Sequence, residues 1–316
     1  MSLCPNFLYA GPDIPWMNPE CIGINTLPPR THLHGFTNEA EAINAKPLDS
    51  HWHLNLDGNW RFRLYQKPAD LDEGCIKPDG KDSEWDSIKV PGNWTMQGYD
   101  SPHYTNVQMP FAHQPPKVPE ENPTGVYRSC FTLPKGWKER RTVIHFGGVE
   151  SAFFVFCNGN KVGFSKDSRT PVEFNLTPWI VSGTNHLTVV VIRWSDGSFL
   201  EDQDHWWMAG PHRSIYLRST AMTYLEDLFS LGELNQNLDE GSLEVEARVS
   251  FTGPVESGWK VGIQLIDPDG NRVFPSMQHE EIPVAEQTRI NLGHLSRFSK
   301  KIHNPELWNT ETPKLY

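Results

Sequence analysis

The sequence predicts an all-β fold, in which a β-sandwich of the jelly-roll type is followed by a smaller immunoglobulin-like β-sandwich. Short segments of alternating apolar and polar residues follow one another at roughly 8 to 12 residue spacing, a pattern typical of sandwiches. Proline and glycine, at 26 and 24 residues, are spread along the chain, as expected of many strands joined by turns. The absence of intervening amphipathic helices counts against an alternating βα barrel.

Residues 1–50 have few strand-like alternations, and we expect an extended amino-terminal arm that contains a short helix over 39–45, capped by Asn38. The jelly-roll domain, residues 51–219, opens with alternating apolar residues around Asp57-Gly58, which predicts a hairpin. A second tight turn is predicted at Asn158-Gly159. Further strands are expected at 125–133, 142–147, 152–157, 161–165, 171–176, 186–194 and 213–219.

Residues 220–316 predict the immunoglobulin-like sandwich, with strands at 224–231, 243–251, 259–267, 272–274 and 288–292. A chain of 316 residues has room for two such domains, since single cores rarely grow beyond about 250–300 residues. The final run, NPELWNTETPKLY, reads like the approach to another strand. We therefore expect this second domain to be truncated.

Composition excludes several classes of function. A net charge of −11 argues against a nucleic-acid partner, which would require a basic surface. No apolar run approaches the roughly 20 residues of a membrane span, and the amino terminus lacks a signal peptide, so we expect a cytoplasmic protein without a membrane segment. The five cysteines are odd in number and form no CxxC pair, which predicts reduced thiols.

Two irregular segments carry the residues expected to form a binding site. Residues 92–111 interleave amide, carboxylate and aromatic side chains, among them Asn93, Asp100 and Asn106, which can hydrogen-bond to sugar hydroxyls. Residues 193–213 contain the acidic run around Asp202 and Asp204, whose oxygens suit a hard cation or a polyol. Turn capping by Asn and Asp, and a solvated acidic turn, are the structural alternatives.

Other catalytic or metal motifs are weak. His32 with His34, and His51 with His53, have the spacing of a zinc pair on a strand but lack a third ligand. The Asn38-Glu39 dipeptide is of the kind that carries a glycosidase acid/base, yet a helix start explains it better. No GxSxG, HExxH or phosphate-loop motif occurs. The sequence therefore predicts no catalytic residue.

Four long segments in register make the chain resemble the amino-terminal part of the bacterial β-galactosidases of glycoside hydrolase family 2. They are VPGNWTMQGYDSPHYTNVQMPF, PPKVPEENPTGVYR, GGVESAFFVFCNGNKVGFSKDSRTPVEFNL and VIRWSDGSFLEDQDHWWMAG. The resemblance implies a galactose-binding-like jelly roll and an immunoglobulin-like domain that precede a (β/α)8 barrel. In that family the barrel carries the two glutamates for retaining hydrolysis of terminal β-D-galactosyl groups, as in lactose. This chain would then be inactive alone.

The resemblance also implies roles for two residues. Asn106, in YTN, matches the asparagine that binds galactose hydroxyls, and Asp204, in EDQD, matches the aspartate that binds both the sugar and sodium. Asp204 would give only a partial sodium site, and magnesium would bind through the missing barrel. The chain departs from the family at Trp207, where better-known members carry arginine. That substitution puts the shape of the neighbouring pocket in doubt.

Two alternatives remain open at the level of sequence. A free-standing carbohydrate-binding module would use exposed aromatic residues, for which Trp94, Trp206 and Trp207 are candidates. A sister specificity within the family, β-glucuronidase or β-mannosidase, would share the same two domains, although the YTN and DQD motifs fit the galactosidases better. The expected partners are a galactoside, the remaining domains of the parent enzyme and, through the arm before Trp52, further copies in a homo-oligomer.

Overall fold

The computed structural model describes residues 4–283 and 294–316, which divide into two compact units. The first comprises the described part of Met1–Pro29 together with His51–Ser219, and the second comprises Arg30–Ser50 and the described part of Thr220–Tyr316. The segment expected to form a single arm is therefore divided at Pro29 between the two units. Almost all regular structure is antiparallel β, which confirms the all-β class.

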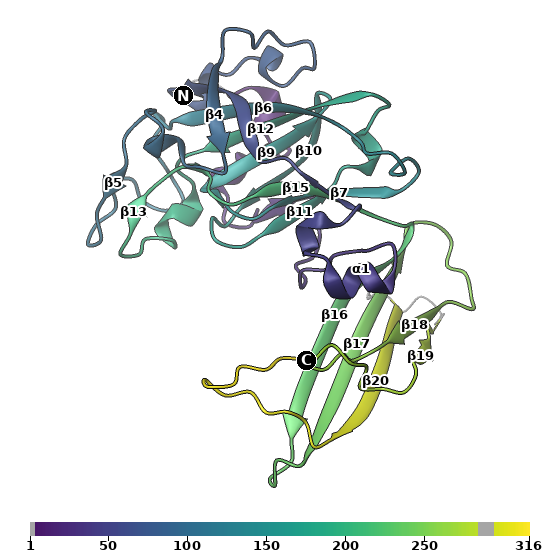
Figure 1. Ribbon diagram of the computed structural model, residues 1–316. Coiled ribbons are helices and arrows are strands. Elements are labelled where there is room, and N and C mark those ends of the chain that lie inside the picture. Colours follow the sequence, from purple (N-terminus) through teal and green to yellow (C-terminus); the bar gives the residue numbers. More distant parts are fainter. Residues whose placement is uncertain (1–3, 284–293) are drawn as a thin grey trace. The chain divides into compact units, whose positions relative to one another are not determined.

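The first unit is a sandwich of two sheets (Figure 1). The larger sheet has the order β1-β10-β9-β12-β6-β3-β4 and consists of Gly23–Ile24, Asn160–Lys166, Ala152–Cys157, Thr184–Ile192, Thr124–Thr132, Gly58–Tyr65 and Asp86–Val90. The smaller sheet has the order β11-β7-β15-β2 and consists of Val172–Asn175, Arg141–Phe146, Ile215–Thr220 and His53–Asn55. The remaining strands of the first unit form two short pairs, β5 (His103–Tyr104) with β13 (Trp206–Trp207), and β8 (Val149–Glu150) with β14 (Gly210–Pro211).

Both faces of the larger sheet are buried. One face meets the smaller sheet in a core that includes Phe62, Phe153 and Phe174. The opposite face is covered by the amino-terminal segment, whose Leu8 and Trp16 pack with Phe154 and other aromatic side chains. All six residues of β9, AFFVFC, are therefore buried, which explains why this strand is continuously apolar and does not alternate.

Several local predictions are confirmed. The six strands predicted between 125 and 194 correspond to β6, β7, β9, β10, β11 and β12, and the one over 213–219 to β15. Asn158 and Gly159 both have positive φ, at 51° and 79°, as the two-residue turn between β9 and β10 requires. Helix α1 spans Glu39–Asn44, and the Asn38 side chain accepts a 2.9 Å bond from the Glu41 backbone N–H.

The hairpin predicted at Asp57-Gly58 is wrong. The strand before it, β2, pairs with β15 in the smaller sheet, whereas β3 pairs with β4 and β6 in the larger one. Only Gly58 has positive φ, and Asp57 instead accepts a 2.8 Å bond through Oδ1 from the Ile215 backbone N–H. The dipeptide therefore marks the passage of the chain from one sheet to the other.

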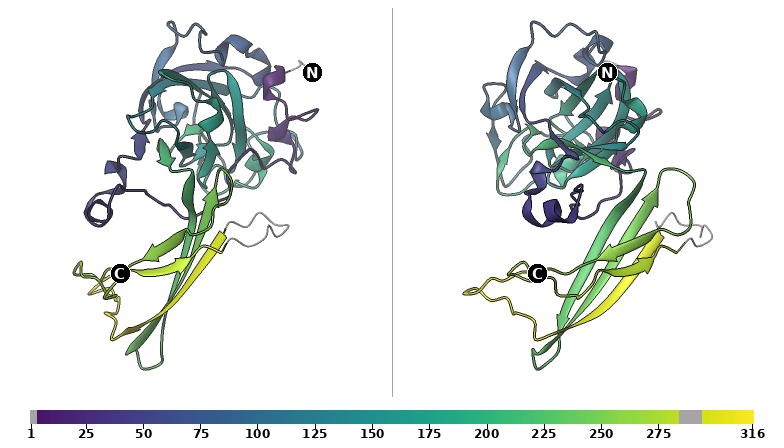
Figure 2. Two further views of the ribbon diagram at one scale, coloured as in Figure 1. Left: turned by 90° about the vertical axis from the view of Figure 1, so that its right-hand side faces the viewer. Right: turned by 45° about the vertical axis from the view of Figure 1, so that its right-hand side comes forward.

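The second unit contains α1 and two small sheets. Strands β16 (Thr223–Leu234), β17 (Glu240–Phe251) and β20 (His294–His303) form one sheet, and their long green and yellow ribbons run side by side in Figure 2. Strands β18 (Lys260–Ile263) and β19 (Gln278–Glu281) form the other. The strand predicted over 259–267 is thus shorter than expected, and 272–274 makes only a bridge from Arg272 to Ile266. The prediction over 288–292 lies outside the described residues.

Short 3-10 turns connect many strands: η1 Asn6–Leu8, η2 Pro15–Met17, η3 Pro47–Asp49, η4 Pro68–Asp70, η5 Glu73–Cys75, η6 Trp94–Met96, η7 Thr177–Trp179 and η8 Asp196–Phe199. No helix within the described residues has the length and apolar character that a membrane span requires. The described residues therefore consist largely of strands, short turns and irregular connections.

A buried ion pair in the first unit connects the amino-terminal segment, which covers the larger sheet, to η8. The Lys166 ammonium lies 2.6 and 2.7 Å from the two carboxylate oxygens of Asp196, and both side chains are less than a tenth exposed. The same ammonium donates to the backbone carbonyl of Asn18 at 2.9 Å. A single charged group thus holds together β10, η8 and the amino-terminal segment.

We expect Lys166→Met to lower the free energy of unfolding of the first unit by about 3–5 kcal/mol, because it leaves the Asp196 carboxylate buried without a counter-charge. Urea unfolding followed by tryptophan fluorescence measures the change. Lys77→Met, which removes an exposed pair with Glu73, is the matched control and should cost about 0.5 kcal/mol or less. The double variant Lys166→Met, Asp196→Leu should recover most of the loss; a double variant as unstable as the single one would contradict this account.

Candidate functional site

The two irregular segments singled out in the sequence meet in the first unit. Strand β5 lies in residues 92–111 and β13 in residues 193–213, and the two pair antiparallel with Trp206 opposite Tyr104 and Trp207 opposite His103. This short ladder brings Asn106 and Asp204 together although they are 98 positions apart in the chain. The predicted convergence of the two loops is therefore present.

The carboxylate of Asp204 is the centre of this cluster. Its Oδ1 accepts a 2.6 Å bond from the Tyr104 hydroxyl and a longer, 3.4 Å bond from the Asn106 amide. All three side chains are exposed, and Oδ2 has no hydrogen-bond partner among the described residues. The bond to Asp204 raises the pKa of the Tyr104 phenol, so the phenol stays protonated and remains the donor. The arrangement presents one anionic oxygen, an amide and an aromatic ring to solvent.

Behind the cluster, buried polar contacts fix the loop that follows Asp204. Glu150 accepts a 3.1 Å bond from the Met208 backbone N–H and pairs with the Arg169 guanidinium at 3.2 Å. The other end of that guanidinium lies 3.2 Å from His205 Nε2. Glu201 accepts two 2.6 Å bonds from Ser168, through its backbone N–H and its hydroxyl. Sequence reasoning missed Glu150, Arg169 and Tyr104 as parts of the site.

The other polar candidates are paired with a cation or have a buried oxygen. Asp100 pairs with Arg193, and Asp196 pairs with Lys166, so neither carboxylate is available to a ligand. The Asn93 side-chain oxygen is buried in the structure, as is Oδ1 of Asp202. Among the amides and carboxylates named in these two loops, Asn106 and Asp204 are the exposed pair in contact.

The tryptophans separate into core residues and one surface residue. Trp94 and Trp207 are 0% and 2% exposed, so the prediction that they offer faces to a sugar is wrong. Trp207 packs against Trp194, with ring centroids 5.4 Å apart, and therefore fills the core beneath β13. Trp206 is 54% exposed and lies 5.6 Å from the Tyr104 ring, which leaves it as the aromatic surface beside Asp204.

No group of three or more His, Cys, Asp or Glu side chains that could hold a metal ion occurs among the described residues. The His32 and His34 rings stack on one another at 6.4 Å, and His51 Nε2 contacts the Lys135 carbonyl at 3.1 Å. The oxygen of Asp204 has the right chemistry for sodium, but it is a single donor. By itself, the cluster could supply one oxygen ligand to such an ion and does not form a complete site.

Comparison with known proteins places both units in one family. The family description "Glycosyl hydrolases family 2, sugar binding domain" matches residues 54–221, and "Glycosyl hydrolases family 2" matches residues 223–316. Beta-galactosidases of Psychromonas ingrahamii and Vibrio cholerae are each 41% identical to the chain over 304 and 302 residues. Each alignment covers 95% of this chain and 29% of the relative, so the chain spans less than a third of their length.

Solved structures share the fold at much lower identity. A Bacteroides uniformis beta-glucuronidase superposes with a TM-score of 0.62 and 20% identity, over 83% of this chain and 29% of that one. A beta-glycosidase from Bacteroides vulgatus gives a TM-score of 0.62 at 22% identity, over 83% of this chain and 30% of that one. At these identities the comparison supports the two-domain fold alone.

The histidine next to β14 gives a pH-dependent prediction. Burial, followed by the nearby Arg169 and Arg213, lowers the pKa of His212 from 6.5 to about 4. Below pH 6.5 the unfolded chain binds a proton here and the folded chain does not until about pH 4. The contribution of neutral His212 to the free energy of unfolding is thus complete above pH 6.5 and is lost as the pH falls toward 4.

Because the ring is partly exposed, we expect this loss to be about 1–2 kcal/mol of unfolding free energy. His212→Gln should flatten the dependence between these two pH values in urea titrations, whereas His113→Gln, at an exposed position, should leave it unchanged. An unaltered slope in the His212 variant would contradict the assignment.

Proposed function

Because the chain belongs to glycosyl hydrolase family 2, we propose that it is the amino-terminal, non-catalytic part of a cytoplasmic β-galactosidase. In this proposal the first unit contributes to the rim of a galactose-binding pocket, and domains beyond residues 1–316 supply the retaining catalytic machinery. The 41% identity to proteins named beta-galactosidase supports the specificity. The exposed cluster of Asp204, Asn106 and Tyr104 carries the assignment of this unit to substrate binding.

The chemistry of the cluster suits a neutral sugar. An amide both donates and accepts hydrogen bonds, and a carboxylate accepts from two hydroxyls, which matches the vicinal diols of a hexose. Asp204 Oδ1 is already engaged by Tyr104, which fixes the carboxylate and leaves Oδ2 as the acceptor for a ligand. Trp206 offers an apolar face at the same edge.

The glutamates inside the first unit support a non-catalytic role. A retaining glycosidase needs two carboxyl groups about 5–5.5 Å apart across the scissile bond, one of them free to attack. Glu150 is engaged by Arg169 and Met208, Glu201 by Ser168, and Glu173 by Arg218 through two bonds of 3.0 and 2.8 Å. Each of these carboxylates orders its surroundings and is not poised over an open pocket.

In this proposal the first unit supplies a ligand to sodium but none to magnesium. Asp204 would donate one oxygen to sodium, which when bound would fix a sugar hydroxyl and offset the carboxylate charge. Its remaining ligands, and any magnesium site, would belong to the other domains. The same proposal has this chain pack against those domains and, in the full-length protein, assemble with further copies into a homo-oligomer.

The alternatives are less well supported. Burial of Trp94 and Trp207 removes two of the three aromatic surfaces that a free-standing carbohydrate-binding module would use. The beta-glucuronidases among the solved structures share the fold at about 20% identity, whereas the beta-galactosidases share 41% of residues over nearly the whole chain. An exposed carboxylate at the sugar site also disfavours a glucuronide, which carries a negative charge of its own.

In the complete enzyme we expect Asp204→Asn to reduce kcat/KM for a galactoside by about tenfold or more and to weaken the dependence on sodium, because the variant keeps the shape but loses the anionic acceptor. Steady-state kinetics across a sodium titration measure both effects. Glu84→Gln, which neutralises an exposed carboxylate outside the cluster, should change neither. Unaltered kinetics and sodium response, or hydrolysis by residues 1–316 alone, would refute the proposal.

Tyr104→Phe tests whether the phenol positions the carboxylate. Removing one hydrogen bond while keeping the ring beside Trp206 should lower kcat/KM by about fivefold, the equivalent of about 1 kcal/mol. The apparent affinity for sodium should shift as well, which a merely structural loss of packing would not produce. If Tyr104→Phe and the parent enzyme bind sodium equally and have the same kcat/KM, the phenol has no positioning role.

A further inference from the structure

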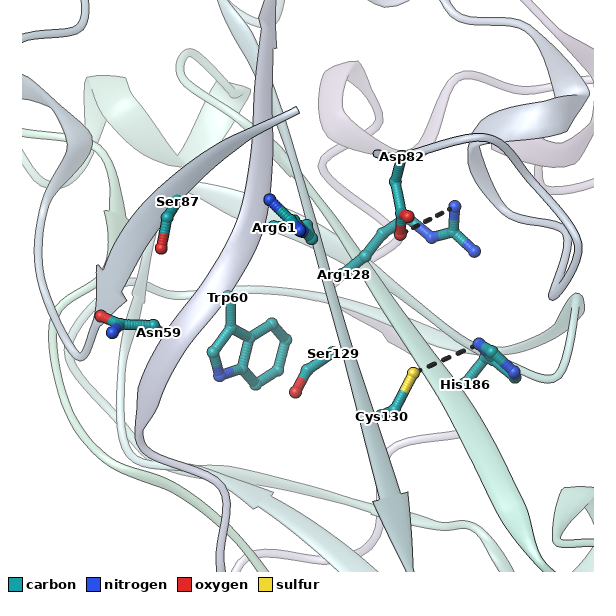
Figure 3. Close-up of a pocket in the computed structure, with 9 residues that line it drawn as sticks. All are labelled: Asn59, Trp60, Arg61, Asp82, Ser87, Arg128, Ser129, Cys130 and His186. Atoms are coloured by element: carbon teal, nitrogen blue, oxygen red, sulfur yellow. Dashed lines mark hydrogen bonds and ion pairs between the residues drawn. The ribbon is translucent and has the colours of Figure 1, made fainter. Parts of the chain in front are cut away.

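A pocket of about 400 Å³ lies in the first unit where the larger sheet splits (Figure 3). The β3–β6 ladder ends at the pair Arg61 and Arg128. Beyond that pair β3 continues only with β4, and β6 continues only with β12. The edges of the two strand pairs therefore diverge, and Trp60 and Ser129, the next residues along each strand, line the opening between them.

The pocket has an unbalanced positive charge. Arg61 and Arg128 are direct cross-strand neighbours, an arrangement that costs stability unless the charges are compensated. Arg128 is compensated by Asp82 at 3.2 Å and donates to the Gly80 carbonyl at 2.8 Å. Arg61 donates only to the Trp85 carbonyl at 3.2 Å and has no carboxylate partner among the described residues. A guanidinium that lacks a counter-charge in a pocket of this size favours a ligand that carries a carboxylate.

The same pocket contains a thiol beside a base. Cys130 is the exposed member of the five cysteines, and its Sγ lies 3.3 Å from Nδ1 of His186, its partner on β12. Burial of the sulfur raises the pKa of the Cys130 thiol despite the opposing charge of Arg128. The thiol is thus protonated at neutral pH and needs a proton acceptor in order to react. Figure 3 shows His186 in that position.

We propose that this pocket is a site of reversible S-thiolation, in which Cys130 exchanges with a small disulfide that bears carboxylate groups. Arg61 holds a carboxylate of the incoming disulfide, and His186 takes the proton from the Cys130 thiol. The sulfur then forms a bond to one sulfur of the disulfide while the original S–S bond breaks. The departing thiolate receives the proton, so the disulfide is the only co-reactant.

The test uses the whole protein that contains this chain, exposed to glutathione disulfide, which bears carboxylates, or to cystamine, which bears amines. Peptide mass spectrometry gives the rate of mixed-disulfide formation at each cysteine. We expect Cys130 to react with glutathione disulfide at least about fivefold faster than the half-buried Cys4 and Cys21. Cys130 should also prefer glutathione disulfide to cystamine by about fivefold at low ionic strength, a preference that salt removes.

Two variants and a matched control identify the groups responsible. Arg61→Gln should abolish the preference for the anionic disulfide, and His186→Asn should slow the reaction of Cys130 with both disulfides. Arg63→Gln changes an exposed arginine on the same strand that lies over the Tyr65 ring and outside the pocket lining, and it should alter neither rate. Circular dichroism verifies that each variant is folded. Reaction of Cys130 no faster than Cys4, or a preference that survives Arg61→Gln, would overturn the proposal.

Discussion

The pairing of β5 with β13 is the constraint on which the candidate sugar site depends. Two residue pairs join loops that are far apart in the sequence, and without them Asn106 and Asp204 would have no fixed relation. So short a ladder is not stable by itself. Its stability comes from beneath, where Trp207 is buried against Trp194 and Glu150 binds the backbone at Met208. The buried layer therefore fixes where the exposed polar cluster lies.

That buried layer explains the tryptophan at position 207. The family resemblance placed a basic side chain there, which would have suggested a polar group at the pocket. In this chain the indole belongs to the core on the face of the larger sheet that the amino-terminal segment covers. The positive charge near the loop comes from Arg169, bound between Glu150 and His205. A basic residue at position 207 is thus not needed to place a guanidinium under the site. Trp207 therefore supports the loop by apolar packing, and Asp204 stays exposed.

Much of the fold could be predicted because local chemistry and tertiary structure agree. Asn158-Gly159 has the residues that a two-residue turn requires, and Asn38 is a good cap, so both could be predicted from the local sequence. Asp57-Gly58 has the same local signal, but its backbone is recruited by Ile215 of another strand, which no local pattern reveals. Strand β19, with the sequence QHEE, lacks an apolar face and gave no signal. In the site, Asn106 and Asp204 followed from the resemblance, whereas Glu150 and Arg169 act through contacts that only the folded chain creates.

The Asp204 cluster and the pocket beside Arg61 differ in the ligands that their charges admit. At Asp204 the fixed charge is negative and its neighbours are a neutral amide and a phenol, so the site favours hydroxyls or a cation and repels anions. At the split of the sheet the uncompensated charge is that of Arg61, so the preference is reversed. A neutral sugar gains little from the pocket beside Arg61, and a carboxylate-bearing disulfide gains nothing from the Asp204 cluster. The two proposals therefore concern ligands that do not compete, and each can fail without affecting the other.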